Sequence, residues 1–356
     1  MASAPTQEKP KWQLYLENEK LEQEQEWGED ITEDLFPIVT PLLLDDGDPV
    51  AASQKAAREF IDLLVNKWVP KDTARRTYDE PNDTPPLYTK ERSLELNFES
   101  LGNFIYGLVP ELPYPGIEHD KILYFLLHIK ELWNQANIDP QVHESSLIYL
   151  FSFDAFLLLS IYYYHSYSSI AYLTGQQKSS DLKFFEYGLE IGASESAGAI
   201  HGSIPYTLEE SNKHLCDPAR SLYAMFARLL AAGVMRVKIL KLISYDLYVL
   251  LRELDKRKPP PSELYLQVHS SIWADYILIA GLELAKEVKN PCGELKFPLT
   301  RAQWKAGAEH LAKVAEKVSE DTPWDLKRCA QKAYQQMREL VPEAFVEEVE
   351  KSETST

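Results

Sequence analysis

Apolar positions recur at helical spacing along most of this chain, and no segment sustains the alternation of a β-strand. The segment HDKILYFLLHIKELW carries Ile122, Phe125, Ile129 and Leu132 on one helical face. Residues 262–288 form another apolar helical pattern. The chain is therefore predicted to be all-α, as a helical bundle or stacked helix pairs of roughly ten helices.

Helix starts are marked by residues that can cap free backbone N–H groups, because Asp and Thr accept these hydrogens and Pro suits the first turn. These starts are Asp48-Pro49, Asp139-Pro140, Thr207-Leu-Glu-Glu210, Asp217-Pro218, Thr300-Arg-Ala-Gln303 and Thr322-Pro-Trp-Asp325. The pattern that begins at Asp217 stays helical to Lys258. The apolar run 35–44 is interrupted by two prolines, so we expect no continuous helix there.

The predicted organisation has three parts. Residues 1–44 are expected to form an acidic N-terminal arm, residues 45–345 a single all-helical domain, and residues 346–356 a disordered acidic tail. Within the domain, the proline-rich residues 69–92 predict a surface loop and residues 186–216 an irregular, Gly- and Ser-rich insertion.

Residues 147–164 read LIYLFSFDAFLLLSIYYY and approach the length of a membrane span. Asp154 lies within the run. Because an acid at the bilayer centre costs about 2.5–3.5 kcal/mol, we expect a buried helix and no membrane partner. The first residues lack a signal-peptide core, and the three cysteines are too few and too scattered for a disulfide framework. We expect a cytoplasmic protein.

The protein is acidic, with a net charge of −18, but the charge is uneven. Residues 1–50 carry a net charge of −10, whereas residues 218–258 carry +6. Arg220, Arg228 and Arg236 are eight residues apart and would form one basic edge on a continuous helix. Such an edge could hold a phosphate or an RNA backbone. The simpler interpretation is that these bases pair with acids elsewhere in the chain.

The segment 186–216 is the best candidate for a site. Glycine weakens regular structure, and long irregular connections often bind ligands. Acids with shifted pKa values, and a loop histidine, can exchange protons near neutral pH. The predicted catalytic residues are His201, Glu195, Glu190 and Glu186.

Substrate binding is assigned to residues around this segment. Arg220 lies near a predicted helix N-terminus, where an anion is favoured. Tyrosines before the segment could line an apolar pocket. The predicted substrate-binding residues are Arg220, Arg228, Tyr164, Tyr167 and His214. His214, Cys216 and Asp217 do not complete a zinc pattern, and no nucleotide-binding motif is present, so neither a metal nor a cofactor is predicted.

Three blocks of the chain resemble the fungal proteins grouped as Domain of Unknown Function 3632. These blocks are HDKILYFLLHIKELW, SLYAMFARLLAAGV and SIWADYILIAGLELAKE, within roughly residues 45–320. The resemblance implies a fungal source and an all-helical fold, and it carries no catalytic residues. The segment 186–220 does not match the family pattern.

Three functions remain open. We favour a small-molecule enzyme of fungal specialised metabolism, without a reaction class, which acts on an anionic or amino-acid-derived substrate by acid/base chemistry. The first alternative is a protein interaction module whose acidic N-terminus docks a basic partner through Trp12 and Trp27. The second is an aminoacyl-tRNA-dependent biosynthetic enzyme whose basic strip grips the RNA, and we do not favour it.

Overall fold

The computed structural model describes residues 9–23, 31–69, 90–135, 216–253 and 261–346, with a few single residues between 185 and 214. Every regular element in these ranges is a helix, which confirms the predicted all-α fold of roughly ten helices. The chain divides into two compact units, Met1–Ser203 and Ile204–Thr356. This division differs from the expected single domain, and its boundary falls inside the segment 186–216.

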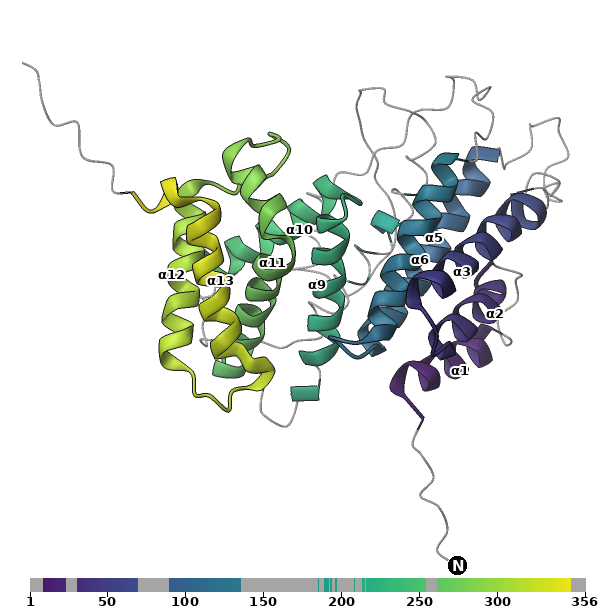
Figure 1. Cartoon of the computed structure of the whole chain (residues 1–356), viewed down its shortest axis with the longest axis horizontal. Coiled ribbons are helices and arrows are strands. Elements are labelled where there is room, and N and C mark those ends of the chain that lie inside the picture. The colour runs from purple at the N-terminus through teal and green to yellow at the C-terminus, as the bar shows by residue number, and fades with distance from the viewer. Residues whose placement is uncertain are drawn as a thin grey trace, which may run out of the picture. The chain divides into compact units, whose positions relative to one another are not determined.

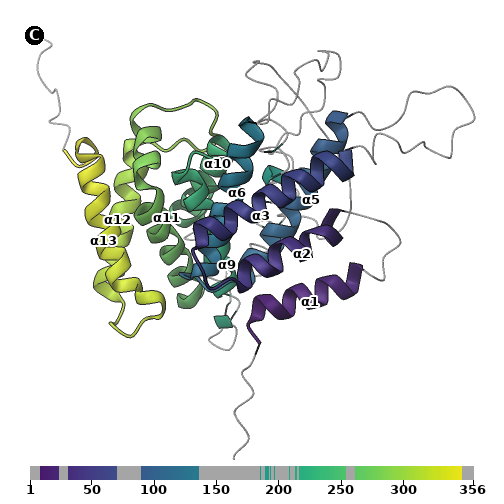
Figure 2. The same ribbon diagram turned by 45° about the vertical axis from the view of Figure 1, so that its right-hand side comes forward.

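The described residues of unit 1 form the α-helices α1 (Lys11–Gln23), α2 (Ile31–Leu44), α3 (Pro49–Leu63), α5 (Lys90–Leu108) and α6 (Ile117–Gln135). Helix α2 lies between α1 and α3, and α3 packs along α6 (Figure 2). A π-helical turn, Leu64–Trp68, extends α3.

The core of unit 1 centres on aromatic rings. Phe98 makes edge-on contacts with Trp133 and Phe185, with ring centroids 5.1 Å and 5.4 Å away. Phe60 lies 6.1 Å from Phe98 and 6.3 Å from Phe125. Edge-on pairs of this kind add to the apolar burial that holds the helices together.

The described part of the predicted N-terminal arm is packed into unit 1. Trp12 and Leu16 of α1 are each 3% exposed, and Ile31, Leu35 and Val39 of α2 are fully buried. The packing of this segment is stabilised by the removal of these apolar side chains from water, which outweighs the repulsion among its acidic residues. Trp12 therefore does not present its ring to a partner protein.

The expectation that prolines interrupt residues 35–44 is wrong. Helix α2 runs through Pro37 and Pro41. Buried apolar residues on both sides of each proline, including Phe36 and Leu42, hold the helix against its neighbours despite the missing N–H groups. The buried ammonium of Lys121 binds the carbonyl oxygens of Leu43 and Asp45 at the end of the helix.

The predicted caps are confirmed at two helix starts. Asp48 Oδ1 accepts the Val50 N–H at 3.1 Å at the start of α3. Thr300 and Gln303 form a complete capping box at the start of α12. By contrast, Thr322 makes no side-chain cap, and α13 starts only at Leu326, after a short 3₁₀ turn.

In the part of unit 2 that the structure describes, the α-helices are α9 (Cys216–Ala231), α10 (Arg236–Tyr248), α11 (Glu263–Lys289), α12 (Arg301–Lys317) and α13 (Leu326–Leu340). Helix α11 lies between α9 and α13, and α12 packs on α13 (Figure 1). Helix α10 contacts both α9 and α11. Because α11 touches each of its neighbours, most of its residues are buried.

The prediction of one helix from Asp217 to Lys258 is wrong, and with it the single basic edge. Helix α9 ends at Ala231 and is followed by Gly233, whose φ is +70°. The Gly233 N–H donates to Leu230 O, and the Val234 N–H donates to Leu229 O. These two bonds form a Schellman motif, which needs a left-handed residue that glycine supplies most easily. Arg236 therefore begins a separate helix.

Several predicted segments lie outside the described residues. They are the apolar run 147–164, the helix starts at Asp139 and Thr207, nearly all of the loop 69–92, and the tail apart from Val346. In the ranges that the structure does cover, no helix combines the length and the apolar character needed to cross a membrane.

Candidate functional site

Five predicted site residues lie outside the described residues: His201, Glu195, Glu186, Tyr164 and Tyr167. The other four are Glu190 in unit 1, and His214, Arg220 and Arg228 in unit 2.

Glu190 is half-buried and lies close to Tyr106 of α5. The Tyr106 side chain is fully buried, and burial raises the pKa of its phenol, with a further contribution from the Glu190 charge. Tyr106 thus stays neutral beside Glu190. The assignment of proton transfer to Glu190 stays a prediction.

Arg220 is held inside unit 2 rather than at its surface. Its guanidinium donates a hydrogen bond of 2.7 Å to Asp275 Oδ2 on α11. Burial raises the pKa of Asp275, and the Arg220 charge opposes that rise. The anion paired with Arg220 in this structure is therefore the Asp275 carboxylate. The role of Arg220 in substrate binding stays a prediction.

Trp324 covers this ion pair from the start of α13. The Arg220 guanidinium lies 5.5 Å from the centre of the Trp324 ring. The indole Nε1–H donates to Asp217 Oδ1 at 2.8 Å. Trp324 and Asp325 both have positive φ, at 64° and 53°. This left-handed backbone is costly for side chains of their size, so the ring contacts must hold it in place.

His214 and Arg228 lie in different surroundings. His214 is exposed, whereas the nearby Cys216 is fully buried at the start of α9. Arg228 is half-buried in the last turn of α9. Among the residues that the structure covers, no group of three or more His, Cys, Asp or Glu side chains is arranged to hold a metal ion.

A pair of residues that the sequence analysis did not select has a more distinctive geometry. The Tyr276 hydroxyl of α11 donates a hydrogen bond of 3.0 Å to Asp246 Oδ2 of α10. Tyr276 is fully buried, while Asp246 keeps a partial exposure. Part of the Asp246 residue is therefore exposed, while its carboxyl group is buried against Tyr276.

Aromatic side chains from two helices pack against Tyr276. Tyr223 of α9 packs edge-on against Tyr276, with ring centroids 6.1 Å apart. Trp273 of α11 lies 6.4 Å from Tyr276, also edge-on. Tyr223 and Trp273 are nearly fully buried. Asp246 is thus hydrogen-bonded to a tyrosine that packs within a buried group of aromatic rings.

This environment changes the acidity of Asp246. Burial raises the pKa of the Asp246 carboxyl to about 7, while the hydrogen bond from Tyr276 acts in the opposite direction. Burial and the Asp246 charge together raise the pKa values of Tyr223 and Tyr276. At neutral pH Asp246 can gain or lose a proton, whereas the two tyrosines remain hydrogen-bond donors.

The backbone beside Asp246 is irregular. A π-helical turn, Val249–Glu253, follows directly after α10. Such turns are rare and occur often at functional sites, where they change the direction of a side chain. Asp246 lies within the basic region 218–258 and was not among the predicted site residues. The available signal was an acid flanked by Tyr245 and Tyr248 on an apolar helix.

Comparison of the chain with protein-family models, with curated proteins and with solved structures found no match.

Proposed function

We propose that this protein binds a small organic molecule in unit 2 and exchanges a proton with it through Asp246. The observation that supports the proposal is the contact between Asp246 and the Tyr276 hydroxyl beside buried aromatic rings. Small-molecule sites typically combine apolar and aromatic walls with a few placed polar groups. Acids in such sites often titrate near neutral pH.

The chemistry is general acid or base catalysis. A carboxyl group with a pKa of about 7 is divided between its two protonation states in the cell, so it can either donate or accept a proton. Tyr276 holds the carboxyl through Oδ2. In this proposal the ligand takes the other carboxyl oxygen. The ligand class is amino-acid-derived, because an ammonium group is a natural partner for the Asp246 carboxylate.

A place in fungal specialised metabolism and a cytoplasmic location belong to the same proposal. The first rests on the resemblance to Domain of Unknown Function 3632. The second rests on the three cysteines, Cys216, Cys292 and Cys329, which are all free thiols and therefore suit a reducing compartment.

Two observations weigh against the alternatives. Docking through Trp12 and Trp27 would need exposed rings, but Trp12 is buried in unit 1. An RNA-binding strip would need available bases, but Arg220 is paired with Asp275 and Arg236 with Glu287. The RNA-binding hypothesis needs these two arginines to contact RNA phosphates, but each is already paired with an acid of the protein.

The proposal is tested by ligand-observed NMR on the purified full-length protein. The probes are the standard amino acids, their decarboxylated amines and their deaminated keto acids. At least one amine-bearing probe should bind the natural protein. The Asp246→Asn variant should bind it at least about tenfold more weakly, because a charge-assisted hydrogen bond contributes about 1.4 kcal/mol or more.

The matched control is Asp321→Asn, which removes an exposed acid from the same unit and should leave binding unchanged. Two results would contradict the proposal: no probe binds the natural protein, or Asp246→Asn binds the probes as tightly as the control does.

A further inference from the structure

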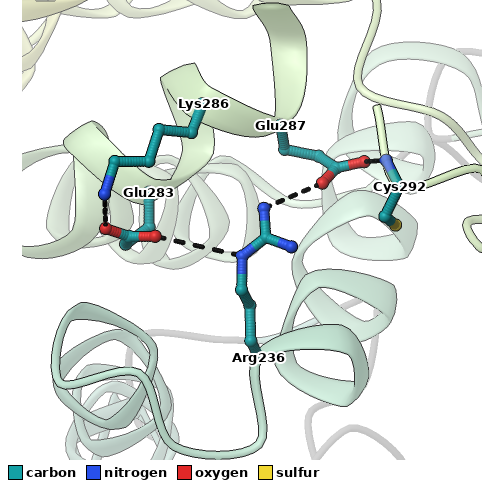
Figure 3. Close-up of polar contacts among 5 residues, drawn as sticks. All are labelled: Arg236, Glu283, Lys286, Glu287 and Cys292. Carbon is teal, nitrogen blue, oxygen red and sulfur yellow. Dashed lines mark hydrogen bonds and ion pairs between the residues drawn. The ribbon is translucent and has the colours of Figure 1, made fainter. Parts of the chain in front are cut away.

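Glu287 is a buried acid in the last turn of α11, with a side chain only 1% exposed. Its Oε2 accepts a hydrogen bond of 3.1 Å from Arg236, and its Oε1 accepts the Cys292 N–H at 2.8 Å (Figure 3). A negative charge is unfavourable both in the interior and at the C-terminal end of a helix. Glu287 therefore depends on both partners, and each partner is tied to α11 through it.

Arg236 is the first residue of α10, so its contacts fix where that helix begins relative to α11. Figure 3 shows its guanidinium between Glu287 and Glu283, whose Oε2 lies 3.9 Å from Arg236 Nε. Glu283 is also paired with Lys286. Glu283 and Glu287 are one helical turn apart, so a single guanidinium meets two successive turns of α11.

The contact between Asp246 and Tyr276 is a second polar link between the same helices. Along α10, Asp246 lies ten residues after Arg236, and along α11, Tyr276 lies eleven residues before Glu287. At a rise of about 1.5 Å per residue, these separations are about 15 Å and 16.5 Å, and they run in opposite chain directions. Both links therefore fit one antiparallel register, and a shift of α10 by one turn would break both.

The loop that follows α11 reinforces this register. The Cys292 N–H is bound by Glu287 near the start of the loop. Near its end, the Phe297 ring stacks on Tyr248 at 4.2 Å and leans on Tyr245 at 5.7 Å. These two tyrosines flank Asp246 in sequence. The loop is thus attached to α11 at one point and to the last turn of α10 at another.

From these contacts we infer that Glu287 is a positioning residue for Asp246. By binding Arg236 and Cys292 at once, it sets the register of α10 on α11 and anchors the loop whose Phe297 packs on Tyr245 and Tyr248. Glu287 does not itself touch the ligand. The importance of this position for activity rests on the proposed function of Asp246, whereas its effect on the Asp246 carboxyl is independent of any ligand.

The test compares Glu287→Gln with Glu283→Gln in the full-length protein. A glutamine at 287 keeps the shape and can still accept the Cys292 N–H, but its amide cannot replace the charge that Arg236 binds. Glu283→Gln removes the more exposed acid beside the same arginine and serves as the control. The readout is the pH titration of the Asp246 carboxyl, followed by ¹³C NMR with labelled aspartate.

Groups from three helices face this carboxyl or its tyrosines: Tyr276, Tyr265 and Asp275 of α11, Tyr223 of α9 and Tyr245 of α10. The raised pKa values of Tyr223 and Tyr276 keep both phenols protonated across the titration range. The midpoint is read from the labelled carboxyl signal that Asp246→Asn removes, which separates Asp246 from Asp275. In Glu287→Gln the midpoint should fall by about one pH unit, because displacement of α10 lessens the burial of the carboxyl. Glu283→Gln should leave it within about 0.3 unit.

A purely structural role for Glu287 would lower the melting temperature of Glu287→Gln and leave the Asp246 midpoint unchanged, and this result would overturn the inference. If Glu287→Gln does not fold, Arg236→Lys weakens the same link from its more exposed end and should move the midpoint in the same direction. Failure of both variants to fold would also overturn the inference, because the pair would then support the whole of unit 2.

The two proposals fail separately. A shifted midpoint in Glu287→Gln, with no probe bound by the natural protein, supports the positioning role and contradicts the proposed function. An unchanged midpoint, together with probe binding that requires Asp246, supports the proposed function and contradicts the positioning role.

Discussion

Arg220 of α9 and Asp275 of α11 form an ion pair of 2.7 Å in which both side chains are about nine-tenths buried. The pair links two helices whose other contacts are largely apolar. Trp324 lies against its outer side. Removal of either partner would leave the other as a buried charge with neither solvation nor an opposite charge, which strongly destabilises a protein.

Replacement of Arg220 by methionine should therefore lower the free energy of unfolding by about 3 kcal/mol, since Asp275 would remain buried without its cation. The double variant Arg220→Met with Asp275→Leu should recover most of this loss. Urea denaturation measures both values. The exposed Arg301→Met is the control and should change stability by less than about 0.5 kcal/mol. A loss that small for Arg220→Met would show that the pair does not stabilise unit 2.

A second prediction concerns the packing of α1 on α5. A Cβ atom added at Gly107 would lie 2.4 Å from the Tyr15 hydroxyl oxygen, which is closer than any real contact. Gly107→Ala should therefore destabilise the protein by about 1–2 kcal/mol, as overpacking does. In a Tyr15→Phe background the hydroxyl is gone, and the same change should be neutral or slightly stabilising, because alanine favours helix.

Thermal or urea denaturation of the four proteins in this cycle measures the coupling between the two positions. If Gly107→Ala has the same effect with and without the Tyr15 hydroxyl, α1 does not pack against α5 in this way. The expectation of a separate N-terminal arm would then regain its support.

A third prediction follows from the raised pKa of Asp246. Between pH 4 and pH 7 the folded protein keeps the Asp246 proton, whereas the unfolded chain has released it. Unfolding thus releases a proton in this window, and the contribution of Asp246 to stability falls as the pH rises from 4 to 7. Above pH 7 the carboxyl is ionised in both states, so no further change is expected.

The Asp246→Asn variant should lack this slope. Its stability relative to the natural protein should rise through the window by on the order of 4 kcal/mol, at about 1.4 kcal/mol per pH unit, and then stay level. Urea denaturation at a series of pH values measures the difference, with Asp321→Asn as the control. A constant difference between pH 4 and pH 8 would show that Asp246 has an ordinary acidity.

Features encoded by neighbouring residues could be predicted from the sequence. The caps at Asp48 and Thr300 depend on atoms within three residues, and both are present. The end of α9 also had a local signal, because Gly233 follows a helical run and glycine commonly ends a helix. By contrast, proline usually interrupts a helix, but α2 continues through Pro37 and Pro41 because its apolar residues are buried.

The candidate site could not be predicted in the same way. Asp246 and Tyr276 are thirty residues apart in sequence, and they meet only because α10 and α11 pack in one register. Burial, which determines the acidity of Asp246, is a property of the packed unit and not of the segment around it. The same holds for Arg220, which the sequence placed beside a helix terminus and which Asp275 holds in the interior.

The most direct test of the acid–base proposal is the titration of the Asp246 carboxyl in the natural protein, with its ¹³C signal assigned through Asp246→Asn. A midpoint near 7, which moves when an amine-bearing probe is added, is the predicted result. A midpoint near the ordinary aspartate value of about 4, unchanged by every probe, would contradict it.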